Sequence, residues 1–275
     1  AIRYVTKQPS DKLEGSIKAT AGQRDRFDVQ GMLNLPIADT LSARFSFAKK
    51  SRGGFIHRII DNTYVGGEDS TTMRGQLRWQ PTSRLDIGIS ADLIRTSDNG
   101  QPSLSTNFSA TDLYPTQLYG VAVAGDPPPS PAAYNSLRAT APLSVSPSGY
   151  TNAASDFAFY YGQIKGQYEI YGGLQPDVNK FKSYGLTGTV AYELTDNLTV
   201  KSLTGYRNIK QIQNQDWDRT PIPLVQLNDS TNIEYLTQEL QLNGSFFDNR
   251  FKWVAGAFYY WDDSTNNRRR FDPSA

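Results

Sequence analysis

The sequence has 275 residues, of which 38% are hydrophobic and 20% are charged, and its formal net charge is +1 at pH 7. The mean hydropathy is −0.53, and no window approaches the roughly 18 consecutive apolar residues that a membrane helix needs, which excludes a helical membrane protein. The small net charge gives no reason to expect a nucleic-acid partner. Because there is no cysteine, disulfides and thiolate metal sites are also excluded.

Apolar and polar residues alternate with a period of 2 in the first third of the chain, which predicts strands with two different faces. In order, these runs cover residues 13–21, 27–37, 41–47, 73–79 and 85–93. The segment 1–9 before them also resembles a short strand, closed by Pro9. The chain begins without an initiator Met or a signal peptide, and we expect both ends to be cuts through a longer protein.

The clearest alternation lies in residues 184–194, where Tyr184, Leu186 and Val190 share one face and small or polar residues share the other. The turn at 195–197 predicts a hairpin with the strand that begins at Leu198. Further strands are predicted at 236–246 and at 251–261, and the last one is too aromatic on both faces to be oriented. The chain is therefore predicted to be all-β and antiparallel, with about nine to ten strands.

The connections between these strands alternate strictly between tight and long after the short first link. The tight turns lie near 38–40, 81–84, 195–197 and 247–249, and the long connections lie near 49–70, 96–182 and 211–230. In an up-and-down transmembrane β-barrel, this pattern places every tight turn at the periplasmic end and every long loop outside the cell. A soluble β-sandwich or solenoid is the alternative, but it has no reason to keep this asymmetry.

Charged residues on the polar faces of the predicted strands also favour the barrel. They are Arg44, Arg74, Arg78, Asp86, Asp92, Glu193 and Glu239. Inside a soluble core, every one of these charges would need a partner. In a water-filled or plug-filled lumen they cost little, and so we expect them to face the lumen.

Three stretches resemble the TonB-dependent outer-membrane receptors. AIRYVTKQP, at residues 1–9, is similar to the segment that closes the plug domain of that family. YGLTGTVAYELTDNLTVKSLTGYRN, which begins at Tyr184, resembles a common hairpin of the receptor barrel. TQELQLNG at 237–244, followed by FKWVAGAFYYWDD from Phe251, resembles a pair of barrel strands of the family.

The resemblance implies a partial barrel from a parent of about 22 strands that surrounds a plug. Residues 1–10 would be the end of the plug domain and 11–275 the first part of the barrel. The TonB box and nearly all of the plug are missing from this sequence, so we expect this piece alone not to transport. In the parent, TonB–ExbB–ExbD would drive import through that N-terminal region.

Candidate ligand-contacting residues are aromatic side chains in the long stretch 96–182, because aromatic rings stack on sugars and flat ligands. They are Tyr114, Tyr119, Tyr134, Tyr150, Tyr160 and Tyr161. Aromatic residues near strand ends on the apolar face are instead expected to form a membrane girdle. These are Phe27, Trp79, Tyr184, Tyr192 and Phe246.

No catalytic residue, metal site or cofactor is predicted. His57, the only histidine, has no recognisable nucleophile and orienting group around it, so we interpret it as a solvated loop residue rather than a ligand or base. Arg52, Arg58 and the run 268–270 are candidates for contact with an anionic siderophore. Contact with lipopolysaccharide phosphates, or ordinary solvation, is the favoured interpretation.

The predicted function is binding of a large or scarce solute, such as a ferric siderophore, vitamin B12 or an oligosaccharide, followed by TonB-driven import at the bacterial outer membrane. The expected partners are outer-membrane lipid, lipopolysaccharide, TonB–ExbB–ExbD and the solute. A passive outer-membrane porin and a secreted β-rich carbohydrate-binding protein are the alternatives. An outer-membrane enzyme is not expected.

Overall fold

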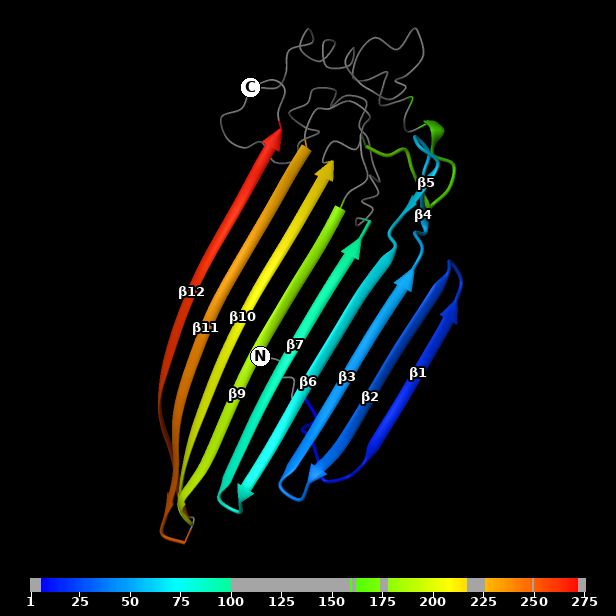
Figure 1. Cartoon of the computed structure of the whole chain (residues 1–275). Coiled ribbons are helices and arrows are strands. Elements are labelled where there is room, and N and C mark those ends of the chain that lie inside the picture. Colours follow the sequence, from blue (N-terminus) through cyan, green and yellow to red (C-terminus); the bar gives the residue numbers. More distant parts are fainter. Residues whose placement is uncertain are drawn as a thin grey trace.

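A computed structural model describes residues 6–99, 159, 162–173, 178–216, 226–248 and 250–271. Nine strands form one antiparallel sheet, the large sheet, in the order β1-β2-β3-β6-β7-β9-β10-β11-β12 (Figure 1). They are β1 (Glu14–Gly22), β2 (Arg26–Ala38), β3 (Leu41–Arg52), β6 (Glu68–Thr82), β7 (Leu85–Asp98), β9 (Val178–Thr195), β10 (Leu198–Asp216), β11 (Gln226–Phe246) and β12 (Phe251–Phe271). β4 (Ile56–Arg58), β5 (Thr63–Val65) and β8 (Glu169–Ile170) form a second, small sheet.

The large sheet is an up-and-down meander, as the alternation of connection lengths predicted. Residues 39–40, 83–84, 196–197 and 247–250 connect strands at one end, the turn end, and the long connections all lie at the other, the connection end (Figure 1). Arg24, Asp25, Phe247 and Asp248 take left-handed backbone angles in the tight links. Such angles suit hairpin turns, because the twist then matches that of the paired strands.

Several strands are longer than their side-chain pattern predicted. β3 reaches Arg52, β7 reaches Asp98 and β10 reaches Asp216, and the long connections shrink to 53–67, 99–177 and 217–225. At these strand ends polar residues occupy both faces, so the alternation disappears although backbone pairing continues. The strand predicted in residues 1–9 is wrong for its described part, because residues 6–10 form no strand.

The two faces of the large sheet differ sharply in polarity. Leu77, Ile89, Leu186 and Val190 share the apolar face and are exposed. A cross-strand row of Asn34, Arg44, Gln76, Ser90 and Thr187 marks the polar face. In the described ranges only Ile56, Val65 and Leu227 are buried hydrophobic residues. A sheet normally buries its apolar face against another layer, and no second layer covers this one among those residues.

Ion pairs join neighbouring strands across the polar face, where the sequence predicted lumenal charges. Their nitrogen–oxygen distances are 2.5 Å for Arg78–Asp86, 2.9 Å for Arg207–Asp92 and 2.8 Å for Arg268–Asp229. These contacts give the polar face fixed charge partners. Within the described ranges, no helix has the length and hydropathy that crossing a membrane requires.

Candidate functional site

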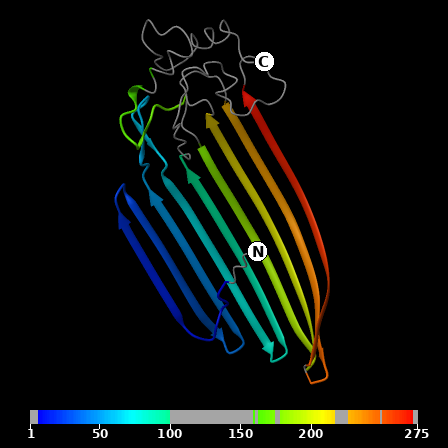
Figure 2. The same cartoon turned by 180° about the vertical axis from the view of Figure 1, so that it is seen from behind.

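The first candidate region is the segment before β1, which crosses the polar face of the large sheet (Figure 2). Asn34 of β2 holds it there and is 0% exposed. The Asn34 side chain accepts a bond from the Ser10 N–H at 3.1 Å and donates to the carbonyl oxygens of Ser10 and Lys12 at 2.9 and 2.6 Å. These bonds satisfy backbone groups of a segment that has no strand partner.

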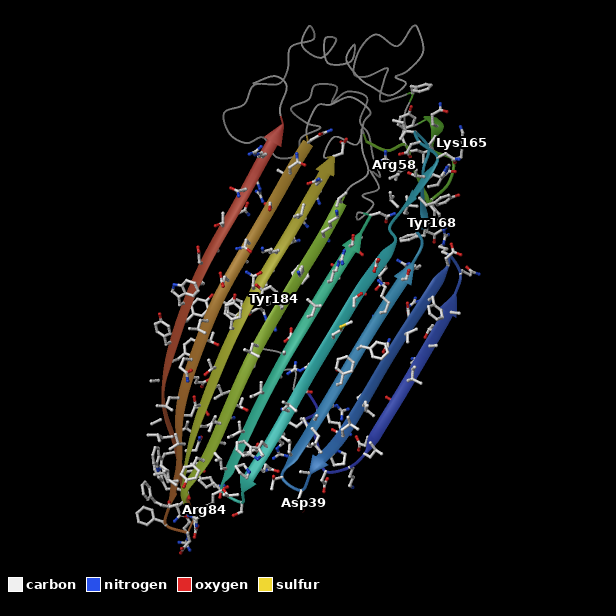
Figure 3. The ribbon with its side chains drawn as sticks, in the orientation of Figure 1. Asp39, Arg58, Arg84, Lys165, Tyr168 and Tyr184 are labelled. Atoms are coloured by element: carbon white, nitrogen blue, oxygen red, sulfur yellow. The ribbon has the colours of Figure 1, made fainter. Side chains whose placement is uncertain are left out.

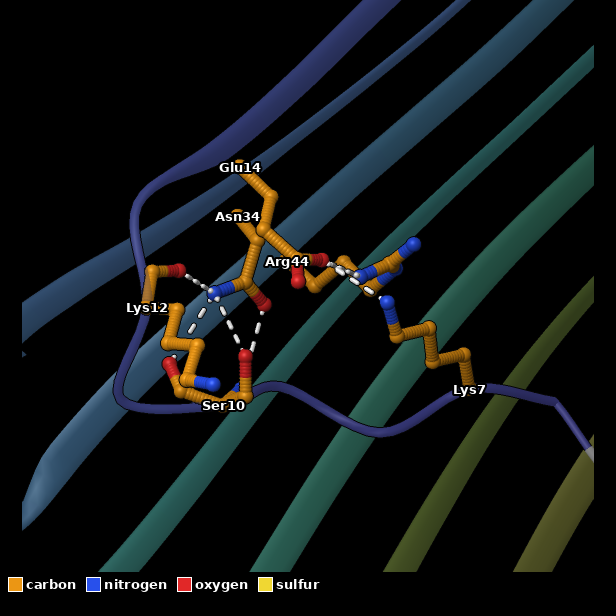
Figure 4. Close-up of polar contacts among 6 residues, drawn as sticks. All are labelled: Lys7, Ser10, Lys12, Glu14, Asn34 and Arg44. Carbon is orange, nitrogen blue, oxygen red and sulfur yellow. Dashed lines mark hydrogen bonds and ion pairs between the residues drawn. The ribbon is translucent and has the colours of Figure 1, made fainter.

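An ion pair and a longer charge contact secure the same segment (Figure 4). Lys7 Nζ lies 2.8 Å from Glu14 Oε2, and the same oxygen lies 3.7 Å from Arg44 Nη1. Pro9 is fully buried between them. The position agrees with the expectation that residues 1–10 join a plug to the barrel, and the sequence gave no pattern that singled out Asn34.

Replacing Asn34 with alanine in the full-length protein should release this segment. The change leaves two carbonyl groups and one N–H without their partner, which we expect to weaken the attachment by about 2–3 kcal/mol. Limited trypsin digestion should then cleave after Lys7 and Lys12 faster than in the wild type. Asn197→Ala, at an exposed turn, is the control and should leave cleavage unchanged; equal rates in Asn34→Ala and wild type would contradict the staple.

The second candidate region is the small sheet at the connection end (Figure 1). β4 and β5 form a hairpin whose turn contains Asn62 in a left-handed conformation, and Ile56 pairs with Val65 on its buried side. β8 adds to β4 in parallel, through His57 N–H to the Tyr168 carbonyl at 2.9 Å. Two connections that are far apart in the sequence thus form one folded unit.

Arg58 is the centre of the small sheet and is only 3% exposed (Figure 3). Its Nη2 donates to the Gly173 carbonyl at 3.0 Å and lies 3.1 Å from Asp61 Oδ2. Gly172 has φ +104°, and a Cβ there would lie 3.2 Å from Arg58 Cζ. The interpretation of Arg58 as a solvated or lipopolysaccharide-binding cation is wrong, because its partners are internal and close to it only in the folded chain.

His57 is half-buried in β4 rather than freely solvated, which corrects the sequence-based interpretation. Its Nε2 lies 2.9 Å from Asn62 Oδ1, its Nδ1 lies 3.8 Å from Glu169 Oε1, and its ring centroid lies 5.2 Å from that of Tyr64. The alternation of the sequence carried no signal for this, since β4 has only three residues. In the described ranges, no cluster of His, Asp and Glu side chains is arranged to hold a metal ion.

Carboxylates also stabilise the small sheet. The backbone N–H groups of Lys165 and Gly166, with a smaller contribution from His57, lower the pKa of Glu169. Burial opposes ionisation of Asp61, but hydrogen bonds from Arg58 and Thr63 outweigh it and lower the pKa of that carboxyl. Both groups therefore favour the folded small sheet in their ionised form.

Acidification should therefore weaken the small sheet. A carboxyl with a depressed folded-state pKa contributes its full stabilisation above its unfolded pKa, about 4.5 for Glu169 and 3.8 for Asp61, and loses it as the pH falls through the folded value. We expect the hydrogen-exchange protection factor of the His57 amide to drop between pH 5 and about pH 3, while that of the Leu77 amide in β6 stays constant. An unchanged factor at His57 would contradict this.

Other predicted site residues have varied placements. Tyr114, Tyr119, Tyr134, Tyr150, Tyr160 and Tyr161 lie outside the described residues. Arg52 donates to the Gly66 carbonyl at 3.2 Å and lies 5.2 Å from the Phe55 ring centroid. Arg268 pairs with Asp229 on the polar face.

The five predicted girdle residues are all exposed hydrophobic side chains. Trp79, Tyr192 and Phe246 lie toward the turn end, and Phe27 lies at the connection end. Tyr184 stands on the apolar face above the middle of β9 (Figure 3). This distribution marks two edges of an apolar band, and contact of these rings with a membrane remains a prediction.

Comparison with solved structures adds independent information about the fold. The ferric yersiniabactin uptake receptor FyuA from Yersinia pestis matches 98% of this chain with a TM-score of 0.63 and 14% identity. The siderophore receptor PiuA from Acinetobacter baumannii matches 95% of it with a TM-score of 0.61 and 15% identity. The chain has the fold of part of a siderophore-receptor barrel.

This receptor-barrel fold confirms the resemblance stated from the sequence, at the level of the fold. The ferric-catecholate import receptor Fiu from E. coli K12, in its closed form, also matches 95% of the chain with a TM-score of 0.59 and 11% identity. The chain spans about one third of the length of each of these receptors. No protein-family model matches the sequence.

Proposed function

We propose that this chain is part of the wall of a TonB-dependent receptor in the bacterial outer membrane. The parent would bind a large or scarce solute at its long connections and import it to the periplasm. The observation that carries this proposal is the large sheet itself. Its nine strands are apolar and exposed on one face, are polar and ion-paired on the other, and match siderophore receptors over nearly the whole chain.

The dimensions of the apolar face support a membrane role. Tyr184 and Leu194 are separated along β9 by about 33 Å, or about 25 Å along the membrane normal for a strand tilted by about 40°. That matches the height of the apolar band of outer-membrane barrels. Lipid would then cover the face that no described residue of the chain covers.

The polar face supports a lumen that holds a plug. The segment before β1 already lies against this face through Asn34, and a plug domain would lead into the barrel by this route. The turn end would face the periplasm and the connection end the cell exterior. There the small sheet would form a rigid base, and Tyr114, Tyr119, Tyr134, Tyr150, Tyr160 and Tyr161 would be available for solute contact.

The solute class is proposed from the similar structures alone: receptors for ferric siderophores match this chain, and we place an iron chelate first, ahead of vitamin B12 or an oligosaccharide. Import would depend on TonB–ExbB–ExbD acting on the plug of the parent. The chain itself spans too little of a receptor to transport, and catalysis has no part in the proposal.

The proposal is tested by uptake in cells. Cells that express the full-length protein should accumulate 55Fe from at least one chelate in a panel of ferric siderophores, and deletion of tonB should abolish the accumulation. Uptake that persists without TonB would indicate a passive porin. A protein that remains soluble and monomeric without detergent would overturn the membrane assignment altogether.

A further inference from the structure

Three exposed cations lie side by side on the apolar face near the connection end. Cross-strand register places Arg95 of β7 opposite Lys182 of β9, and Lys182 opposite Lys210 of β10. All three side chains are exposed, and exposed Lys180 lies two residues further along β9 on the same face. Directly opposite residues have Cβ atoms about 4.5–5.5 Å apart, so these four residues form one cationic row.

The cationic row has no anionic partner in the part of the chain that the structure describes. None of its members forms an ion pair or hydrogen bond there, whereas Lys49, further along the same register row, pairs with Asp69. Like charges directly opposite one another on a sheet destabilise it. A fold that accumulates them on one face requires a compensating anion from outside.

The position of the row restricts the kind of anion. One step toward the turn end, on the same face of the same strands, lie Leu93 and Tyr184, and further along β9 come Leu186 and Val190. The cations therefore border the rim of the apolar band. The row also faces away from the polar face, which excludes solutes that pass through a lumen.

We propose that the cationic row binds the phosphate groups of a phosphorylated glycolipid in the outer leaflet, with its acyl chains lying along the apolar face below. This inference rests on the proposed membrane location. Guanidinium and ammonium groups form charge-assisted hydrogen bonds with phosphate oxygens, and basic clusters at a membrane rim recognise anionic headgroups. Tyr184 adds an aromatic ring with a hydroxyl at the boundary between headgroup and acyl chain.

The test measures binding of radiolabelled bis-phosphorylated lipid A to the full-length protein in detergent micelles. Compared with wild type, the variant R95Q/K182Q/K210Q should bind more weakly by on the order of 100-fold. Glutamine keeps the aliphatic stem and removes the repulsion, so folding should persist, as heat-modifiable gel mobility will show. The control K18Q/R250Q/K252Q removes three exposed cations from other surfaces and should bind as wild type does.

Two further arms identify the recognised group. Dephosphorylated lipid A should bind wild type as weakly as lipid A binds the triple variant, and millimolar inorganic phosphate should not displace the lipid. Equal binding by wild type and triple variant, or equal binding of both lipids, overturns the inference, and so does displacement by inorganic phosphate. Because TonB-dependent uptake by the triple variant should persist, failure of this inference is separable from failure of the proposed receptor function.

Discussion

Val190→Arg is expected to destabilise the folded full-length protein by about 2–4 kcal/mol, because it places a charge near the middle of the apolar face. Val190 is 41% exposed, and its side chain lies in register with Ile87 on the same face. In water this substitution would be harmless, since an exposed valine tolerates a charged replacement. A large cost therefore arises only if lipid covers this face. Urea titration of the protein folded into lipid vesicles measures it.

Thr189→Arg is the matched control, because adjacent strand residues point to opposite faces. Thr189 lies on the polar face beside Gly88, whose missing side chain leaves room for a longer residue. The change removes only a 3.4 Å hydrogen bond to the Gly88 carbonyl. We expect a shift below about 1 kcal/mol; equal costs for both variants would show that the two faces do not differ in solvent.

Arg58→Met is expected to destabilise the small sheet by about 2–4 kcal/mol, because it removes a buried cation that bonds both Asp61 and the Gly173 carbonyl. β8 should then detach from β4. Hydrogen exchange at the Ile59 amide, which donates to the Ile170 carbonyl at 2.9 Å, reports this directly. Protection there should fall by a factor of about 30 or more, while β9 and β10 keep theirs.

Arg84→Met provides a control with the same change in charge. Arg84 pairs with Asp196 at 2.7 Å, but both side chains are largely exposed. Exposed ion pairs contribute little, about 0–1 kcal/mol, so exchange at Ile59 should be unchanged. Solute uptake in Arg58→Met then shows whether the small sheet supports binding: reduced affinity with normal expression is the expected outcome.

The alternation of residues 184–194 was sufficient to predict a strand, its two faces and its hairpin, because side-chain direction in a strand follows from chain position alone. The same reasoning predicted the polar-face charges, including Arg78, Asp86 and Asp92. The up-and-down order followed from the connection lengths. These features are local, and local features can be predicted without tertiary contacts.

The small sheet and the Asn34 staple could not be predicted in this way. Arg58 finds Gly173 at a sequence separation of 115, and Asn34 finds Ser10 at a separation of 24. A single polar letter in a strand or loop gives no indication of such a partner. The strand ends beyond Ser97 and Gln211 were missed for a related reason, since backbone pairing there continues without a side-chain pattern.

The most direct test of the account is to measure which face of β9 contacts lipid. The natural chain has no cysteine, so single cysteines at each position from 184 to 194 in the full-length protein can carry nitroxide labels cleanly. In reconstituted bilayers, even-numbered positions should be accessible to oxygen and odd-numbered ones should not, with the aqueous nickel chelate excluded from the even set. Equal accessibility of both sets to the chelate would contradict a membrane-facing sheet.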